Sequence, residues 1–350
     1  MVLRDISDCK QIERYYGGLS CQKMGITLDG KNYMMKLPGN LKSRDMKNVV
    51  LSYSNSPVCE YIGSHIFELF GIDTHKTELA IYKGKVVVLC EDFLEYGDTL
   101  YEFRQLKATY ADGFITPDGE LSDGTGADID EALLVIRNHI AYSKFPEYEL
   151  LFWKMFIIDA LIGNSDRNNG NYGIIQNSNN SRIAPIYDNG NCLNPTWDDA
   201  KMCTHMKSGI EQEAFLGKTC FFTKGGKPVN PFQLILRGEY PLCTKALYQI
   251  LLDLDLYKIY DIIYSIPCLT NAQAIWYKEV LGARARQLIA ILPDNSVEMQ
   301  EYARKIKLDY KDLVSKVYEQ IPTLWLVSSD KETCAVNYWD VYKSANGITL

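Results

Sequence analysis

Two spacings of apolar residues divide the chain. Up to residue 95, apolar residues occur in short runs bounded by turn residues, and the segments 33–38, 78–82 and 85–89 therefore predict β-strands. Asp29-Gly30 and Lys83-Gly84 stand beside these runs and predict hairpin turns. The clustering predicts that the first part of the chain is mostly antiparallel sheet.

Helical spacing interrupts this pattern once and dominates the later part of the chain. Residues 57–70 carry apolar side chains three and four positions apart, and Gly71 follows them as a stop signal. The same spacing recurs in three later segments, 242–266, 271–292 and 309–320. We therefore expect two lobes that meet near residues 90–97, with one main helix in the first lobe and a mostly helical second lobe.

A strongly apolar run at 152–162 ends at Gly163, and a dense polar segment follows directly. This segment offers a carboxylate, a cation and several amides between Gly163 and Gly170, which predict a loop. Asp166 and Asn171 have the spacing at which a catalytic loop presents an aspartate to a substrate hydroxyl and an asparagine to a metal ion on bound nucleotide. The pattern is typical of a phosphotransferase.

Two short strands are expected next, at 172–176 and 182–187, on either side of a turn-rich stretch. Asp188 follows the second strand directly. A carboxylate at a strand end, about two dozen residues after Asp166, is placed to bind the magnesium ion that bridges nucleotide phosphates. Asn171 and Asp188 are therefore the metal-ligand candidates.

The segment from Ile162 to Asn171, followed by Ala184-Pro185-Ile186-Tyr187-Asp188, resembles the catalytic and metal-binding motifs of HipA-type serine/threonine kinases. More distantly, it is similar to phosphoinositide kinases. The resemblance is to the short, kinase-core-only members, because the chain begins almost at the expected phosphate loop.

The resemblance implies an α+β, bilobal protein-kinase-like fold with ATP and Mg²⁺ as cofactors. An N-lobe at 1–95 would hold a small antiparallel sheet, the phosphate loop, the strand lysine and the hinge. A mostly helical C-lobe at 96–350 would hold the catalytic and metal-binding loops. The opening residues 1–13 are expected to form a helix or a lead-in to the first strand.

The same resemblance assigns roles to particular residues. Asp166 would be catalytic, and Lys36 would hold the α- and β-phosphates as the strand lysine does in protein kinases. The other expected nucleotide-binding residues come from the glycine-containing loop, the hinge and the polar motifs: Gly18, Ser20, Lys23, Glu91, Asp92, Phe93, Asn168, Asn171 and Asp188.

Two of the expected N-lobe residues have a second interpretation. Lys36 could be an ordinary solvent-facing strand residue, because lysines are mostly exposed. Glu60 could pair with Lys36 or with the metal, or it could be an acidic residue favoured by the helix dipole in the first turn of the helix at 57–70. The sequence leaves both alternatives for Glu60 open.

Composition narrows the class of protein. The chain has 350 residues, 47% of them hydrophobic, which is enough for a sizeable core. A formal net charge of −7 argues against a protein whose main task is to bind DNA phosphates.

The ten cysteines include no Cys-x-x-Cys pair and no signal peptide is evident, so a reducing cytoplasm is expected. Apolar runs are too short to span a bilayer, so no membrane is expected.

Three hypotheses for function follow. The first is an ATP-dependent serine/threonine protein kinase whose partner is a protein substrate with a Ser/Thr acceptor, with an operon-encoded regulator as a further partner. The second is a lipid or small-molecule kinase, since the Asn-x-Asp-Arg-x-x-x-Asn pattern is also similar to phosphoinositide kinases. The third is a nucleotide-binding or interaction module without turnover.

Two loops carry further expectations. The segment 110–130 is rich in Gly and Asp but lacks the phasing of a calcium loop, so we expect a mobile surface loop. In the phosphate loop we predict autophosphorylation at Ser20, because phosphate there would compete with ATP for Lys23 and the loop amides.

Overall fold

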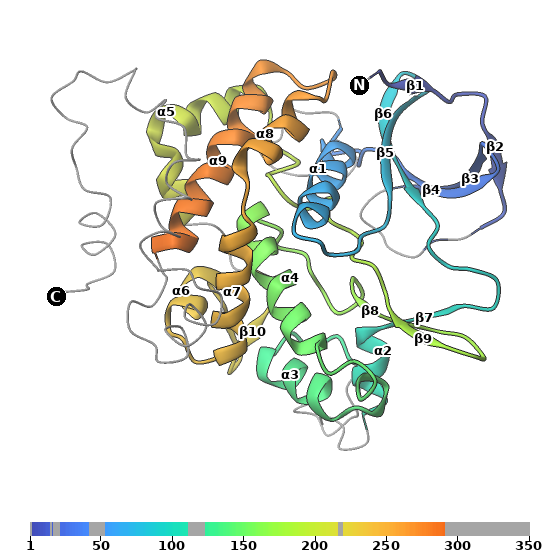
Figure 1. Cartoon of the computed structure of the whole chain (residues 1–350). Helices are drawn as coiled ribbons and strands as arrows, with labels where there is room; N and C mark the ends of the chain where they lie inside the picture. Colours follow the sequence, from blue (N-terminus) through green and yellow to red (C-terminus); the bar gives the residue numbers. More distant parts are fainter. Residues whose placement is uncertain are drawn as a thin grey trace, which may run out of the picture.

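The computed structural model describes residues 2–14, 16, 22–41, 53–110, 123–215 and 220–290, without the side chains of 210–215. A curled sheet with one helix beside it forms one side of the molecule, and a group of helices forms the other (Figure 1). This is the two-lobe α+β architecture that the sequence predicts.

The N-lobe sheet has six strands in the order β1-β5-β6-β4-β3-β2. Only β1 pairs in parallel, with β5, and the other neighbours are antiparallel. The bounds are β1 (Arg4–Asp5), β2 (Lys10–Ile12), β3 (Lys23–Leu28), β4 (Lys31–Lys36), β5 (Thr77–Tyr82) and β6 (Lys85–Glu91). Both predicted hairpin turns are present, and their residues have the positive φ that a two-residue hairpin turn needs: 50° and 80° at Asp29 and Gly30, 49° and 73° at Lys83 and Gly84.

The prediction for residues 1–13 is wrong where it favours a helix. The segment forms β1 and β2, at the two edges of the sheet, where β5 and β3 supply hydrogen-bond partners for its backbone. Ile6 between them is buried in the small core of the sheet. The structure of this segment is therefore decided by pairing with β5 and β3, which lie elsewhere in the sequence.

Helix α1 (Ser56–Leu69) agrees with the predicted helix within one residue at each end. Pro57 stands at its start, and Gly71 follows it with φ 66°. At its centre, Gly63 lies against the segment that follows Asp188, because a Cβ on Gly63 would be 2.9 Å from the Cβ of Asn189. The glycine therefore permits α1 to approach the metal-binding candidate closely.

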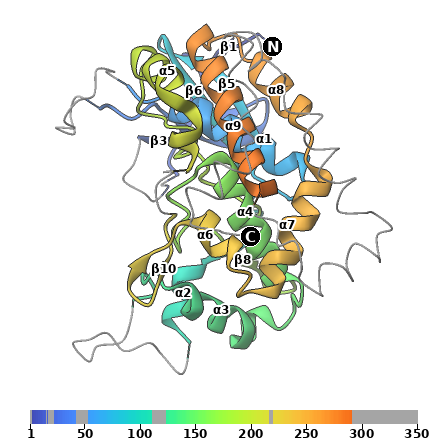
Figure 2. The ribbon, with the colours of Figure 1, turned by 90° about the vertical axis from the view of Figure 1, so that its left-hand side faces the viewer.

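The second lobe is built around α4 (Tyr148–Ile162), which is buried along most of its length and ends at Gly163 with φ 68°. The other helices are α2 (Phe103–Ala108), α3 (Ile129–Asn138), the short 3₁₀ turn Ile140–Tyr142, α5 (Asp199–Phe215), α6 (Pro231–Leu236), α7 (Pro241–Asp253), α8 (Leu256–Tyr264) and α9 (Asn271–Ala290). Helix α7 packs along α4, and α9 packs against α5 and α4 (Figure 2).

The segment 242–266 departs from its prediction, and the lobe also contains a helix that the sequence did not predict. The segment 242–266 forms two helices, because Asp255 accepts a hydrogen bond from the Lys258 amide (3.1 Å) and starts α8 anew. The polar stretch up to residue 230 contains the unpredicted helix α5, kinked at Gly209, whose polar composition hid it. The predicted helix at 309–320 lies outside the described residues.

A small antiparallel sheet joins the lobes. It consists of β7 (Thr99–Glu102), β8 (Gly173–Gln176) and β9 (Ser181–Ile183), and β8 and β9 form the predicted hairpin with a shorter second strand. Beyond β9, Ile186 forms a bridge to Thr74 of the N-lobe. The chain therefore delivers Asp188 to the junction of the lobes. A separate two-stranded ribbon pairs β10 (Thr223–Lys224) with β11 (Lys227–Pro228).

None of the helices within the described ranges is both long enough and apolar enough to cross a membrane.

Candidate active site

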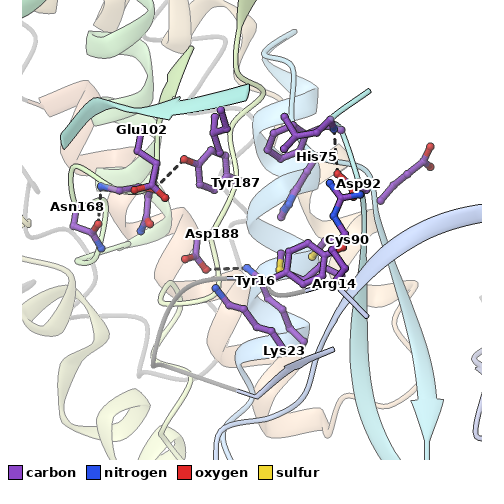
Figure 3. A pocket seen from close by; sticks show the side chains of 18 of the residues that line it. Arg14, Tyr16, Lys23, His75, Cys90, Asp92, Glu102, Asn168, Tyr187 and Asp188 are labelled. Atoms are coloured by element: carbon purple, nitrogen blue, oxygen red, sulfur yellow. Dashed lines mark hydrogen bonds and ion pairs between the residues drawn. The ribbon is translucent and has the colours of Figure 1, made fainter. Parts of the chain in front are cut away.

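A cavity of about 510 Å³ lies between the lobes, and we call it the lobe-junction cavity (Figure 3). The predicted site residues that line it come from both lobes: Lys23, Lys36, Glu91, Asp92, Phe93, Asp166, Asn168, Asn171 and Asp188. Gly18 and Ser20 lie outside the described residues. The structure therefore brings nine of the predicted side chains together around one space.

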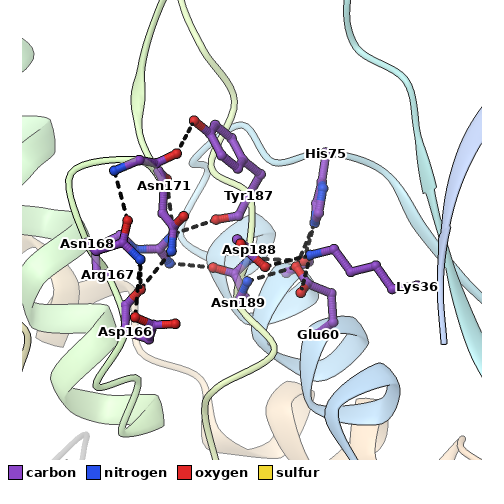
Figure 4. Close-up of polar contacts among 12 residues, drawn as sticks. Lys36, Glu60, His75, Asp166, Arg167, Asn168, Asn171, Tyr187, Asp188 and Asn189 are labelled. Atoms are coloured by element: carbon purple, nitrogen blue, oxygen red, sulfur yellow. Dashed lines mark hydrogen bonds and ion pairs between the residues drawn. The ribbon is translucent and has the colours of Figure 1, made fainter. Parts of the chain in front are cut away.

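The Lys36 ammonium reaches the carboxylates of Glu60 and Asp188 (Figure 4). Its side chain is buried at the end of β4, and Nζ lies 2.7 Å from Glu60 Oε2 and 2.8 Å from Asp188 Oδ1. Burial alone would lower the pKa of Lys36, but the two carboxylates raise it well above its usual value. The solvent-facing alternative for Lys36 is wrong, and the ammonium stays charged.

Glu60 pairs with Lys36, which is one of its two open alternatives. Because α1 begins at Ser56, Glu60 lies beyond the first turn, and the helix-dipole explanation does not apply. Its second oxygen, Oε1, lies 2.9 Å from His75 Nε2 and accepts a hydrogen bond from the Asn189 amide at 2.8 Å. Burial would raise the pKa of Glu60, but Lys36 and His75 lower it well below its usual value.

Asp188 stands in a strained piece of backbone, with φ 62°. Its pKa is lowered chiefly by the charge of Lys36, so the carboxylate stays ionised. The next residue, Asn189, is fully buried, and its side chain donates to Ser64 Oγ at 3.0 Å. Gly190 follows where a Cβ would be only 3.0 Å from Glu60 Oε2. The direction of the Asp188 side chain is therefore set by packing against α1.

Arg167 anchors the polar loop (164–171) to the rest of the lobe. Its guanidinium forms two hydrogen bonds to the carboxylate of Asp159 on α4, at 2.8 and 3.0 Å, and a third to the side chain of Asn189. It also donates to the Tyr187 carbonyl at 2.5 Å and to the Asn171 carbonyl at 3.3 Å. Arg167 therefore connects α4, the polar loop and the segment around Asp188.

Asp166 projects from the same loop and is only half-buried. Its amide donates to Asn164 Oδ1 (3.1 Å), its carbonyl accepts from Asn171 Nδ2 (2.7 Å), and its carboxylate accepts from Asn168 Nδ2 (3.1 Å). Burial raises the pKa of Asp166, and the nearby charge of Asp188 adds to this effect. The pKa values of Asp166 and Asp188 are thus shifted in opposite directions. This is the pattern expected for a proton acceptor beside a metal ligand.

No family model matches the chain, but individual proteins are similar to it along most of its length. The chain is 28% identical over 321 residues to the serine/threonine-protein kinase CtkA of Helicobacter pylori, covering 88% of this chain and 94% of CtkA. The crystal structure of that proinflammatory kinase superposes with a TM-score of 0.75 at 26% identity, over 88% of this chain and all of CtkA. The chain is a homologue of CtkA.

The same comparison extends to the HipA fold. HipA of Shewanella oneidensis, solved in complex with HipB and operator DNA, gives a TM-score of 0.50 at 15% identity, over 81% of this chain and 68% of HipA. The bilobal kinase-like fold class and the resemblance to HipA-type kinases are thereby confirmed. This CtkA homologue is a mixed α+β protein with a curled N-terminal sheet and a helical C-terminal region.

The segment between β6 and β7, where the sequence predicts the hinge, also lines the cavity. Glu91 is ion-paired with Lys31 at 2.9 Å, and Asp92 with Arg14. The ring centroids of Phe93 and Tyr187 lie 5.7 Å apart. The Tyr187 hydroxyl donates a hydrogen bond to the Gly170 carbonyl at 2.9 Å. Two aromatic rings therefore form an apolar wall of the cavity beside the predicted hinge.

Several residues that shape this site escaped the sequence prediction. Arg14 and Tyr16 reach the cavity from the segment before β3, and burial raises the pKa of the Tyr16 hydroxyl to about 12. His75 gave no signal, because it stands alone among scattered histidines. Asp159 could have been found, since a lone carboxylate in an apolar helix needs a buried partner.

The expectation of a mobile loop at 110–130 is partly wrong. Residues 111–122 lie outside the described residues, but the carbonyls of Gly124 and Gly126 accept hydrogen bonds from Asn169 Nδ2 at 2.8 and 2.9 Å. Asn169 is buried, and its Oδ1 accepts from the Tyr172 hydroxyl at 3.0 Å. The end of this segment therefore supports the polar loop.

Proposed function

We propose that this chain is an ATP-dependent serine/threonine protein kinase. The observation that carries the proposal is the position of Lys36, whose ammonium joins Glu60 on α1 to Asp188 while Asp166 and Asn171 line the same cavity. Lysine, helix glutamate and metal-binding aspartate are the three groups that a kinase must bring together. The homologue CtkA is named as a serine/threonine-protein kinase.

The side chains present fit ATP with Mg²⁺. Asp188 offers a carboxylate, and Asn171, whose Nδ2 is used by the Asp166 carbonyl, offers its amide oxygen. These oxygen donors suit Mg²⁺, which takes few protein ligands and completes its shell with phosphates and water. Bound Mg²⁺ would neutralise phosphate charge. Lys36 and Lys23 would hold the phosphates, and residues 91–93 would meet the adenine.

Asp166 would act on the acceptor. Its carboxylate would orient the Ser or Thr hydroxyl and accept its proton as the hydroxyl oxygen bonds to the γ-phosphorus. The bond from that phosphorus to the bridging oxygen breaks, and ADP leaves with the bond electrons. The raised pKa of Asp166 makes it a better proton acceptor than an ordinary aspartate.

The test is transfer of radiolabelled γ-phosphate by the purified chain, with three acceptors offered separately: the chain itself, a Ser/Thr peptide library and phosphoinositide vesicles. We expect acid-stable label on serine or threonine, lost in Asp166→Asn. Label on lipid alone would favour the lipid-kinase alternative, and nucleotide binding without transfer would favour the non-catalytic module. Either result would overturn the proposal.

Autophosphorylation at Ser20 stays part of the proposal. Mass spectrometry of the chain after incubation with Mg²⁺ and ATP would locate the label, with Ser20→Ala as the comparison. Label confined to other residues would contradict it.

We further propose a division into lobes at 1–95 and 96–350 and a cytoplasmic location. The eight cysteines in the described ranges are free thiols, which fits a reducing compartment. A protein acceptor is the partner that the proposal requires, and an operon-encoded regulator is the second partner that we propose.

A further inference from the structure

His75 lies in the short connection between α1 and β5, and the roles proposed above do not include it. Its side chain is 1% exposed and lines the lobe-junction cavity (Figure 4). Its Nε2 lies 2.9 Å from Glu60 Oε1 and 3.2 Å from Ser64 Oγ, both on α1. A histidine is thus buried beside the carboxylate that pairs with Lys36.

The direction of the hydrogen bond between His75 and Glu60 follows from the charge of Glu60. Burial would raise the pKa of this glutamate, but Lys36 and His75 lower it well below its usual value. The ionised carboxylate can only accept, so His75 Nε2 carries a hydrogen and donates it. A hydrogen bond to a charged acceptor is stronger than one between neutral groups, so this contact holds the carboxylate firmly.

The two oxygens of Glu60 have separate partners. Oε1 accepts from His75 Nε2 at 2.9 Å and from the Asn189 amide at 2.8 Å. Oε2 lies 2.7 Å from Lys36 Nζ. Because two donors hold Oε1, the carboxylate cannot rotate away from the ammonium without breaking these contacts. The orientation of Glu60 toward Lys36 is therefore set by groups outside the ion pair.

The backbone of His75 belongs to the contact between the lobes. Its amide donates to the Ile186 carbonyl at 3.1 Å, and the Ile186 amide donates to the Asp73 carbonyl at 2.8 Å. Ile186 stands just before Asp188 in the sequence. The residue that contacts Glu60 through its side chain thus also holds, through its backbone, the segment that carries Asp188.

The Lys36 ammonium lies between two carboxylates, Glu60 and Asp188. Under the proposed function Asp188 binds Mg²⁺, so Glu60 is the carboxylate left to hold Lys36 against the nucleotide phosphates. A kinase needs this lysine–glutamate pair and the metal-binding aspartate in place together. A group that fixes Glu60 and is attached to the Asp188 segment serves both needs.

We infer that His75 is a positioning residue of the proposed kinase. Its imidazole holds Glu60 in the orientation that directs Lys36 to the phosphates, and its backbone keeps this pair aligned with Asp188. The inference rests on the proposed function, because it uses the roles proposed there for Lys36 and Asp188.

The first experiment removes the donor and then restores it. His75→Phe keeps an aromatic ring without an N–H, whereas His75→Gln places an amide N–H the same number of bonds from the backbone as Nε2. In His75→Phe we expect kcat/KM for ATP to fall about tenfold or more, the size expected for a lost hydrogen bond to a charged group. His75→Gln should restore most of it, and the KM for the acceptor peptide should not change in either variant.

His65 provides a matched control, because it is also a histidine paired with a glutamate of α1. Its Nδ1 lies 2.7 Å from Glu68 Oε2, but it lines neither of the two cavities that contain Asp166. His65→Phe should leave kcat/KM for ATP unchanged. Thermal unfolding verifies that each variant is folded. If phenylalanine at position 75 prevents folding, His75→Asn, whose amide is one bond shorter, takes its place.

A double-mutant cycle tests whether His75 acts through Glu60. Glu60→Gln removes the charge that holds Lys36, so a further His75→Phe change should cost little, and the two losses in kcat/KM should fall well short of multiplying. Losses that multiply in full would show that His75 supports the fold in some other way, and would overturn the inference.

A direct readout comes from the imidazole N–H resonances of the ¹⁵N-histidine-labelled chain. The hydrogen bond to Glu60 should protect the Nε2 hydrogen of His75 from exchange with water and move its resonance downfield. His75→Phe assigns the resonance, and Glu60→Gln should move it upfield. A resonance that is the same in Glu60→Gln as in the wild type would contradict the contact on which the inference depends.

The outcomes separate the two proposals. If the wild type transfers phosphate and His75→Phe has the same kcat/KM for ATP, or His75→Gln does not restore it, the positioning role is overturned and the kinase remains. If the wild type binds ATP but labels no acceptor, the proposed function is overturned. Calorimetric titration with ATP and Mg²⁺ then decides on His75 alone: weaker binding in His75→Phe than in His75→Gln supports its hold on Glu60 and Lys36, and equal binding overturns it.

Discussion

Asp166 and Arg167 are neighbours in the polar loop, and their side chains are in opposite conditions. Arg167 is 2% exposed and hydrogen-bonds to Asp159, to Asn189 and to two backbone carbonyls. The Asp166 carboxylate is half-buried and accepts from Asn168. The anchored side fixes the backbone from which the reactive side projects, so the same loop combines a rigid base with a carboxylate that can receive an acceptor.

The largest expected effect on stability comes from removing the contacts of Arg167. Arg167→Met should lower the free energy of unfolding by about 3–5 kcal/mol, because it leaves the Asp159 carboxylate buried without its charge partner. Chemical denaturation monitored by circular dichroism measures the loss.

A double-mutant cycle with Asp159→Leu tests the reason. Once both charges are gone, much of the lost stability should return, since two apolar side chains replace a buried pair. Full additivity of the two single losses would show that the pair is not the cause.

Substitution of Asp166 should remove activity and leave the stability of the fold unchanged. Asp166→Asn is expected to lower kcat by about 10³-fold, within the range for a lost general base. The melting temperature and the calorimetric ATP affinity should be close to wild type, because the Asp166 carboxylate has few contacts. A destabilised Asp166→Asn protein would contradict the division of roles between the two neighbours.

This division explains what the sequence could predict. Asp166, Asn171 and Asp188 lie within two short motifs, so their spacing and the family resemblance were enough to select them as candidates, and the structure places all three on one cavity. The local signals for α1 and for both N-lobe hairpins were also sufficient. Lys36 came from a strand pattern together with the order of motifs along the chain.

The contacts that the sequence did not reveal are long-range. His75 meets Glu60, and Asn189 meets both α1 and Arg167, only because the fold brings these segments together. The edge strands in residues 1–13 and the helix α5 were missed for a related reason: their short or polar sequences form structure only against partners that spacing cannot identify.

Asp188 gives an intermediate test of the comparison, because we propose that it binds the metal ion. We expect Asp188→Asn to weaken ATP binding in the presence of Mg²⁺ by at least about 10-fold, because the loss of even an outer-shell partner of a metal ligand costs that much. Without Mg²⁺ the loss should be smaller. Calorimetric titrations under both conditions measure it, with Asp166→Asn as the control, and equal losses in both variants would show that their roles are misassigned.

The smallest expected effect concerns Asn168, whose hydrogen bond lowers the pKa of the Asp166 carboxylate. Asp166 must be ionised to accept a proton, and its pKa is raised by burial, so activity should fall as the pH decreases through that raised value. The hydrogen bond from Asn168 Nδ2 stabilises the ionised form and partly opposes the shift. Its removal in Asn168→Ala should therefore move the acid limb of the kcat profile to higher pH.

Asn168→Asp completes this series. The new carboxylate keeps an acceptor for the Gly170 amide, which Asn168 Oδ1 now supplies at 2.9 Å, so the local turn is retained. It also places a second negative charge beside Asp166, which disfavours ionisation further. The acid limb should then lie at increasing pH in the order wild type, Asn168→Ala, Asn168→Asp, with similar rates on the plateau. An unchanged limb in both variants would mean that a group other than Asp166 controls the pH dependence.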